Sequence, residues 1–161
     1  MSCDDLYYRC KTFVDNLDLG PVPSLSDIRY LIKQRRGRNL CFLERPLQEI
    51  GLTGVWLEFD DPSTPDVIVY EKDTSRAHQR QIICHEFAHQ LLDHHPDRVL
   101  HQDEWSTLLT VTSPIAAARM LGRHVYESVE EHEAETVATL LNLQITSGKL
   151  SADPARLTLG A

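Results

Sequence analysis

Apolar residues recur at helical spacing in the first part of the chain. Over Asp4–Leu17 they fall at steps of three and four residues, which places them on one face of a helix. A second helix is predicted to begin at an N-cap formed by Ser24 or Ser26. It should end at Gly37, because glycine readily adopts the left-handed conformation of a helix C-cap. The pattern therefore predicts N-terminal helices over residues 1–38.

The pattern then changes to short runs rich in Val, Ile, Trp and Phe, separated by Pro, Gly or acidic residues. Runs of this length and composition are typical of β-strands. We expect three strands, at Asn39–Leu43, Gly54–Phe59 and Asp66–Tyr70. Because the connections between them are short and rich in turn residues, we expect a small antiparallel sheet over residues 39–70.

Helical spacing returns after the predicted sheet. Thr74 or Ser75 can act as the N-cap of a long helix, and Pro96 stops it, so this helix is predicted over residues 74–95. Its apolar face, which would bury the helix against a core, consists of Ile82, Ile83, Phe87, Leu91 and Leu92.

The last third of the chain begins with a segment that has weaker periodicity, residues 98–123. We expect an insertion here, with short helices around Glu104–Leu109 and Ile115–Leu121. A final amphipathic helix is predicted over residues 127–147, closed by Gly148. Helices on either side of a small sheet predict an α+β fold in which the sheet packs on helices.

Composition and charge limit what such a domain can do. The chain has 161 residues and a formal net charge of −8, so we expect one domain over residues 1–161 and no direct nucleic-acid groove. It contains no apolar run of about 20 residues that could span a bilayer. The first five residues are acidic where a secretory signal is basic, and the four cysteines show no metal or disulfide spacing. These features predict a cytoplasmic protein that does not bind membranes, of unknown oligomeric state.

Two of the eight histidines are spaced so that they can bind one metal ion. His85-Glu86-Phe87-Ala88-His89 is an HExxH arrangement, in which two imidazoles lie one helical turn apart and can bind the same metal ion. Glu86 is rotated by about 100° from His85 on the helix, where it can accept a proton from water beside the metal. We therefore predict His85 and His89 as metal ligands and Glu86 as the catalytic base.

A catalytic zinc site needs a third protein ligand, and the final helix offers several carboxylates. Glu133 lies one turn from Val129 and from Val137, on the predicted apolar face, so we take it as the third ligand. Glu130 is the alternative, about 60° away around the helix. Glu131 and Glu135 are rotated by about 160° from Glu133 and are expected to face solvent. Zinc is the expected metal, although manganese and iron also accept this donor set.

Other residues near the motif receive weaker assignments. Tyr126 and His124 precede the final helix and are candidates for stabilising an oxyanion during hydrolysis. His94 and His95 follow the end of the long helix and are expected to be exposed. Cys84 adjoins the first ligand and is expected to be a buried small hydrophobe.

These residues resemble the ImmA/IrrE family of zinc-dependent endopeptidases. The similarity covers roughly Leu25 to Leu143. The matching segments are Asp66–Tyr70, His78–Ile83 leading into His85, and Glu131-His132-Glu133-Ala134 followed by Val137-Ala138. The sequence differs at Ala88, where the family has Gly. The resemblance implies a small zincin-like domain, zinc held by His85, His89 and Glu133, and Glu86 as the base. It also implies cleavage of a helix-turn-helix transcriptional repressor.

Together the residues favour a zinc-dependent endopeptidase whose substrate lies extended along the Asp66–Tyr70 strand. The alternative is a non-catalytic zinc-containing regulatory or interaction module, in which His132 or His124 closes the metal site as a fourth ligand. A DNA-binding protein is a further alternative, indicated only by the basic run Lys33–Arg38.

Overall fold

The computed structural model describes residues 2–96, 98–101, 103–110 and 128–152. In chain order the elements are α1 (Cys3–Asp15), α2 (Leu25–Arg36), β1 (Leu40–Arg45), the 3-10 turn η1 (Gln48–Ile50), β2 (Gly54–Phe59), β3 (Asp66–Glu71), α3 (Arg76–Leu91), β4 (Arg98–Leu100), α4 (Glu104–Thr110) and α6 (Ser128–Ala152). The α+β class is confirmed. The predicted helix Ile115–Leu121 lies outside the described residues, and no helix in the described ranges has the length and hydropathy to cross a membrane.

The sheet differs from the prediction in both strand number and direction. Within the described residues it has four strands, in the order β1-β3-β2-β4. Only β2 and β3 pair antiparallel, as a hairpin across the Asp60–Pro65 turn, whereas β1 pairs parallel to β3 and β2 pairs parallel to β4. The prediction of three antiparallel strands is therefore wrong. Parallel pairing joins segments that are distant in sequence, and no local pattern in either segment specifies it.

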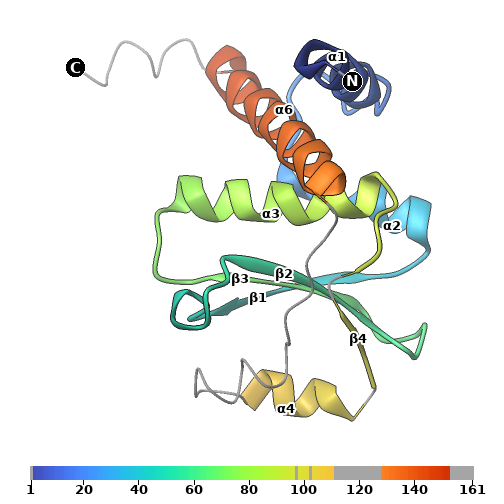
Figure 1. Ribbon diagram of the computed structural model, residues 1–161, viewed down its shortest axis with the longest axis vertical. Coiled ribbons are helices and arrows are strands. Elements are labelled where there is room, and N and C mark those ends of the chain that lie inside the picture. The colour runs from blue at the N-terminus through green and yellow to red at the C-terminus, as the bar shows by residue number, and fades with distance from the viewer. Residues whose placement is uncertain (1, 97, 102, 111–127, 153–161) are drawn as a thin grey trace.

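Helices cover both faces of this sheet (Figure 1). On one face lie α1, α2, α3 and α6, and on the other lies α4. The side chains of β3 alternate accordingly, because successive residues in a strand point to opposite faces. Ile68 belongs to the core beneath α3, while Val67 and Val69 belong to the core on the side of α4. A strand buried on both faces in this way is apolar almost throughout.

Helix α6 packs against α3 through small side chains, and α1 packs against α6. Ala88 of α3 and Ala134 and Ala138 of α6 are fully buried in the same core cluster. Small residues let two helix backbones approach closely, since side-chain bulk sets the distance between the axes. This contact brings the first turns of α6 alongside the second half of α3.

The basic end of α2 is tied to the sheet. Gly37 has φ 69° and caps the helix as predicted. Nε of Arg38 lies 2.7 Å from Oδ1 of the buried Asp66, and Arg36 stacks over the ring of Trp56 with its guanidinium carbon 4.6 Å from the centroid. Because Arg36 and Arg38 are largely buried in these contacts, they do not form an open basic surface for DNA.

Candidate metal centre

Helix α3 holds both predicted histidine ligands in a rigid setting. Its N-cap is Ser75, whose hydroxyl accepts a hydrogen bond from the backbone N–H of His78. Most of its second half is buried between the sheet and α6. His89 is fully buried, and His85 is exposed to 22% on its side chain. Packing on both sides leaves these imidazoles little freedom to rotate.

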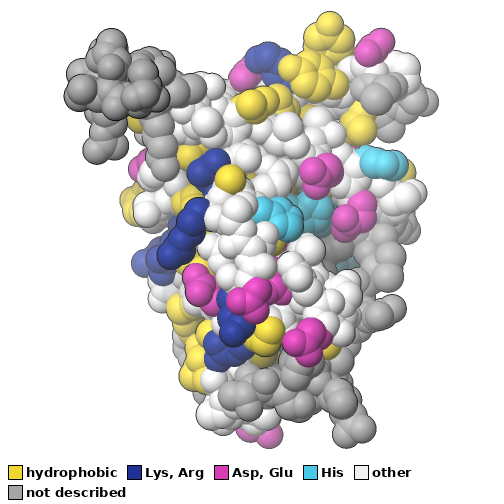
Figure 2. All heavy atoms as spheres, turned by 90° about the vertical axis from the view of Figure 1, so that its left-hand side faces the viewer, with side chains coloured by type: hydrophobic (Ala, Val, Ile, Leu, Met, Phe, Trp, Pro, Cys, Tyr) yellow, Lys and Arg dark blue, Asp and Glu magenta, His cyan; other side chains and the backbone are white. Residues whose placement is uncertain are grey.

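The ligand atoms of His85, His89 and Glu131 converge. The two imidazole Nε2 atoms are 3.1 Å apart, and the carboxylate oxygens of Glu131 lie 3.5 Å from that of His85 and 3.3 Å from that of His89. Atoms bound at about 2.0–2.1 Å in a tetrahedral zinc site are about 3.3 Å from one another. The three side chains are therefore spaced as the ligands of one small cation, and among the described residues they form the cluster that can hold a metal. Figure 2 shows one face of the molecule, on which histidine and acidic side chains lie near one another.

The carboxylate that lies with the two histidines is Glu131, and the predicted ligand Glu133 lies elsewhere. Glu133 lies on the other flank of α6, where its Oε1 accepts a hydrogen bond from Nη2 of Arg9 at 2.6 Å. Its Oε2 lies 3.6 Å from Nε2 of His94. Neither Glu133 nor the alternative, Glu130, belongs to the cluster formed by the two histidines. Glu131, expected to face solvent, takes that place.

The difference follows from how α6 is rotated about its axis. Val129, used to define the apolar face, is 51% exposed, and the buried stripe consists of Ala134, Val137, Ala138, Leu141 and Ile145. At about 100° per residue, Glu131 lies about 60° from the centre of that stripe, and Glu133 lies about 100° from it on the opposite side. The alanines at 134 and 138 were the signal that could have located this stripe.

Comparison with known proteins gave no match. No family model, no curated protein and no solved structure matches this chain. The case for function therefore depends on the motif and on the geometry of the site.

The environment of His89 favours the neutral imidazole that a metal requires. Burial, together with the neighbouring His85 and His94, lowers the pKa of His89 from 6.5 to about 3. A histidine that stays unprotonated at neutral pH presents a lone pair on Nε2 to a cation. The cluster thus fits a divalent ion such as zinc by donor type and by spacing, and His89 also fits by its protonation state.

Glu135 supports the other histidine ligand. Its Oε2 lies 3.2 Å from Nδ1 of His85, and its Oε1 lies 3.4 Å from Nε2 of Gln81. A carboxylate that accepts the Nδ1–H of a ligating histidine fixes the tautomer, so that Nε2 faces the metal. Glu135 was predicted to face solvent. Its side chain is 62% exposed, yet it contacts the ligand on the side away from the cluster.

Glu86, the predicted base, is buried and faces the sheet. Its side chain is placed by Gly54, the first residue of β2. A β-carbon at position 54 would lie 3.0 Å from Oε1 of Glu86 and 2.5 Å from Cγ2 of Ile82. The missing side chain of Gly54 therefore leaves room for Glu86, a role that the sequence did not indicate.

The remaining assignments have mixed outcomes. Tyr126 and His124, the oxyanion candidates, lie outside the described residues. His132, the proposed fourth ligand, is exposed and is not in the cluster. Cys84 is fully buried as expected, and burial raises the pKa of its thiol to about 12.

Two histidines follow the end of α3. His95 is exposed as expected, but His94 is buried and its Nδ1 lies 2.8 Å from Nδ1 of His89. The expectation that His94 is exposed is therefore wrong.

Proposed function

We propose that this chain is a zinc-dependent endopeptidase. The observation that carries the proposal is the convergence of His85, His89 and Glu131 at 3.1–3.5 Å, with Glu86 between the two histidines in sequence and on the same helix. In the described part of the chain three protein ligands surround the position. Three ligands with a remaining open position are typical of catalytic zinc sites, whereas structural sites have four.

In the proposed hydrolysis of a peptide bond, the cation and Glu86 have separate roles. A bound zinc ion supplies Lewis-acid polarisation of a peptide carbonyl and makes water acidic near neutral pH. The carboxylate of Glu86 accepts one proton from the attacking water as the oxygen–carbon bond forms. It then gives that proton to the nitrogen of the leaving amine as the carbon–nitrogen bond breaks. The net reaction consumes one water and returns Glu86 to its starting state.

The substrate position needs revision from the sequence-based hypothesis. β3 pairs with β1 on one side and with β2 on the other, so the Asp66–Tyr70 segment has no free edge. β2 pairs with β4 only from Leu57 onward. In the described part of the chain, the side of Gly54–Trp56 facing away from β3 has no strand partner. An extended substrate added there would lie next to Glu86.

The substrate class follows from resemblance alone. The HExxH string and the Glu131–Ala138 segment resemble the ImmA/IrrE endopeptidases, and that resemblance implies a helix-turn-helix repressor as the protein that is cleaved. We therefore propose the helix-turn-helix protein encoded nearest to this gene as the first substrate to test.

The Glu86→Gln variant tests the proposal. Glutamine keeps the size of the side chain but cannot accept the proton, so zinc content should equal that of the wild type while cleavage falls by at least about 100-fold. Zinc is measured by elemental analysis and cleavage by mass spectrometry of the incubated repressor. The matched control is Glu130→Gln, which changes a half-buried carboxylate outside the cluster and should leave both quantities unchanged. Cleavage by Glu86→Gln at the wild-type rate would exclude Glu86 as the base.

A further inference from the structure

A chain of polar contacts leads away from the metal cluster toward the N-terminal helix. Nδ1 of His89 lies 2.8 Å from Nδ1 of His94, on the side of the ring away from the cluster. Nε2 of His94 lies 3.6 Å from Oε2 of Glu133. The other oxygen of Glu133 accepts a hydrogen bond from Nη2 of Arg9 at 2.6 Å. The side chain of His94 is only 7% exposed, so its contact with His89 is shielded from water.

The way α3 ends brings His94 to this position. Leu92 is the C-cap, and Asp93 adopts the left-handed conformation with φ 58°. The backbone N–H of Asp93 donates to the carbonyl of Gln90 at 3.3 Å, and that of His94 donates to the carbonyl of His89 at 2.9 Å. This pair of bonds is a Schellman motif, which folds the chain back over the last turn of the helix. The ring of His94 consequently packs on the ring of His89, with centroids 5.0 Å apart.

Metal binding would decide which of the two histidines donates the hydrogen bond between their Nδ1 atoms. A metal ligand at Nε2 of His89 leaves the ring proton on Nδ1, so His89 must be the donor. Nδ1 of His94 must then be the acceptor, which leaves the proton of a neutral His94 on Nε2. This Nε2 atom lies 3.6 Å from Oε2 of Glu133. The negative charge of the carboxylate therefore favours the tautomer of His94 that carries its proton on Nε2 and accepts from His89 on Nδ1.

We propose that His94 is a positioning residue for the metal ligand His89, and that Glu133 holds His94 in the required tautomer. The proposal rests on the metal site of the proposed function and deepens it. Outer contacts of this kind orient a ligating imidazole and raise its basicity. Here the acceptor is a second histidine in place of the usual carboxylate or carbonyl. Glu133, predicted as a ligand, acts one step further out.

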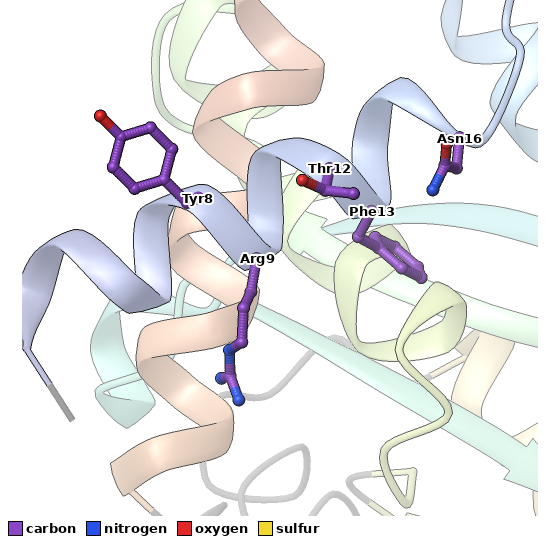
Figure 3. Close-up of a pocket in the computed structure, with 5 residues that line it drawn as sticks. All are labelled: Tyr8, Arg9, Thr12, Phe13 and Asn16. Atoms are coloured by element: carbon purple, nitrogen blue, oxygen red, sulfur yellow. The ribbon is translucent and has the colours of Figure 1, made fainter.

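Arg9 extends the contact to α1. Figure 3 shows its side chain leaving α1 toward α6, on the opposite side from Tyr8. Its guanidinium holds Oε1 of Glu133, which leaves Oε2 to face His94. Because the side chain of Arg9 is 54% exposed, we expect its contribution to be smaller than that of His94.

The test compares zinc affinity in His94→Leu, His94→Asn and His95→Leu with the wild type, by competition with a chelator. His94→Leu should bind zinc about 10- to 100-fold more weakly, since it removes the acceptor for His89. His94→Asn should stay within a few-fold of the wild type, because its amide oxygen occupies nearly the same place as Nδ1. His95→Leu changes the exposed neighbouring histidine and should have no effect.

A spectroscopic measurement separates positioning from simple support of the fold. In the zinc-loaded wild type, NMR should show a hydrogen-bonded Nδ1–H of His89, and His94→Leu should lose this downfield signal while His94→Asn keeps it. If His94→Leu does not fold, Glu133→Gln and His94→Asn provide the comparison, with Glu133→Gln expected to weaken zinc binding by a few-fold. Equal zinc affinity in the wild type and in both the His94→Leu and Glu133→Gln variants would overturn the inference and leave the metal site intact. Absence of zinc binding by the wild type would instead overturn the proposed function.

Discussion

Three glutamates in the first turns of α6 do three different things. Glu131 faces both histidines of the cluster, Glu135 contacts the outer nitrogen of His85, and Glu133 pairs with Arg9 beside His94. An acidic run at a helix N-terminus is stabilised by the helix dipole in any case, which makes such runs common. Their partners, not their charge, distinguish these three carboxylates from one another.

At this scale the sequence brought His85, Glu86 and His89 together, but it did not indicate Glu131, the carboxylate that lies with the two histidines. His85, Glu86 and His89 lie within five residues on one helix, so helical geometry alone fixes their relative positions. The position of Glu131 depends on how α6 is rotated against α3, which is set by the packing of Ala134 and Ala138. That packing joins segments about 50 residues apart, and no local periodicity specifies it.

A residue-scale prediction concerns His101, which is remote in sequence from the cluster. Its Nδ1 lies 3.0 Å from Oδ2 of Asp60, and this hydrogen bond raises the pKa of His101 and lowers that of Asp60. A raised pKa in the folded state means that the pair stabilises the fold fully below 6.5, the ordinary value for histidine, and that this stabilisation is lost as pH rises through the raised pKa. On the acid side it is lost as pH falls through the lowered pKa of Asp60.

NMR titration of His101 measures this directly. The midpoint should lie above 6.5 in the wild type and should fall in Asp60→Asn. Asp103→Asn is the control, because Asp103 acts on His101 only as a minor charge and should shift the midpoint less. A midpoint that does not change in Asp60→Asn would show that the pair does not form in solution.

The ends of elements were more predictable than their pairing. Ser24, Ser75 and Gly37 cap their helices as the sequence indicated, because a cap depends on a few adjacent residues. The parallel pairing of β1 with β3 and the three-residue strand β4 were not predicted. Both depend on contacts between distant segments, and β4 is too short to show a strand pattern.

Gly54 gives an element-scale prediction, since β2 approaches α3 there. In Gly54→Ala the new methyl group would lie 2.5 Å from Cγ2 of Ile82 and 3.0 Å from Oε1 of Glu86, so Ile82 must move and the carboxylate of Glu86 must shift slightly. Unfolding by denaturant should show a loss of about 1–3 kcal/mol. If Glu86 is the base, cleavage should fall by up to about 100-fold, because catalysis is sensitive to the position of the reacting group.

The Gly37→Ala variant separates a loss of stability from a loss of cleavage. A β-carbon at position 37 would meet nothing within 4 Å, but φ there is 69°, so the variant should lose about 1 kcal/mol of stability through backbone strain. Its cleavage of the proposed substrate should equal that of the wild type. Wild-type cleavage by Gly54→Ala as well would mean that Gly54 does not position Glu86.

At the scale of the whole molecule, the site is assembled by packing between three helices. α3 carries His85, His89 and Glu86, α6 carries the carboxylates, and α1 packs on α6 with Arg9 at the contact. Figure 1 shows all three on the same face of the sheet. The sheet supports α3 from below and places Gly54 under Glu86. The fold class follows from the sequence, but the ligand set depends on this assembly.

The most direct test of the account is the zinc affinity of the wild type, Glu131→Gln and Glu130→Gln, measured by chelator competition. We expect one zinc per wild-type chain, held by two imidazoles and a carboxylate. Glu131→Gln should bind more weakly by about 100-fold or more, since loss of a direct ligand exceeds the 10- to 100-fold effect of an outer contact. Glu130→Gln should match the wild type. A wild type that takes up no zinc, or a Glu131→Gln variant that binds it as tightly as the wild type, would contradict the metal centre described above.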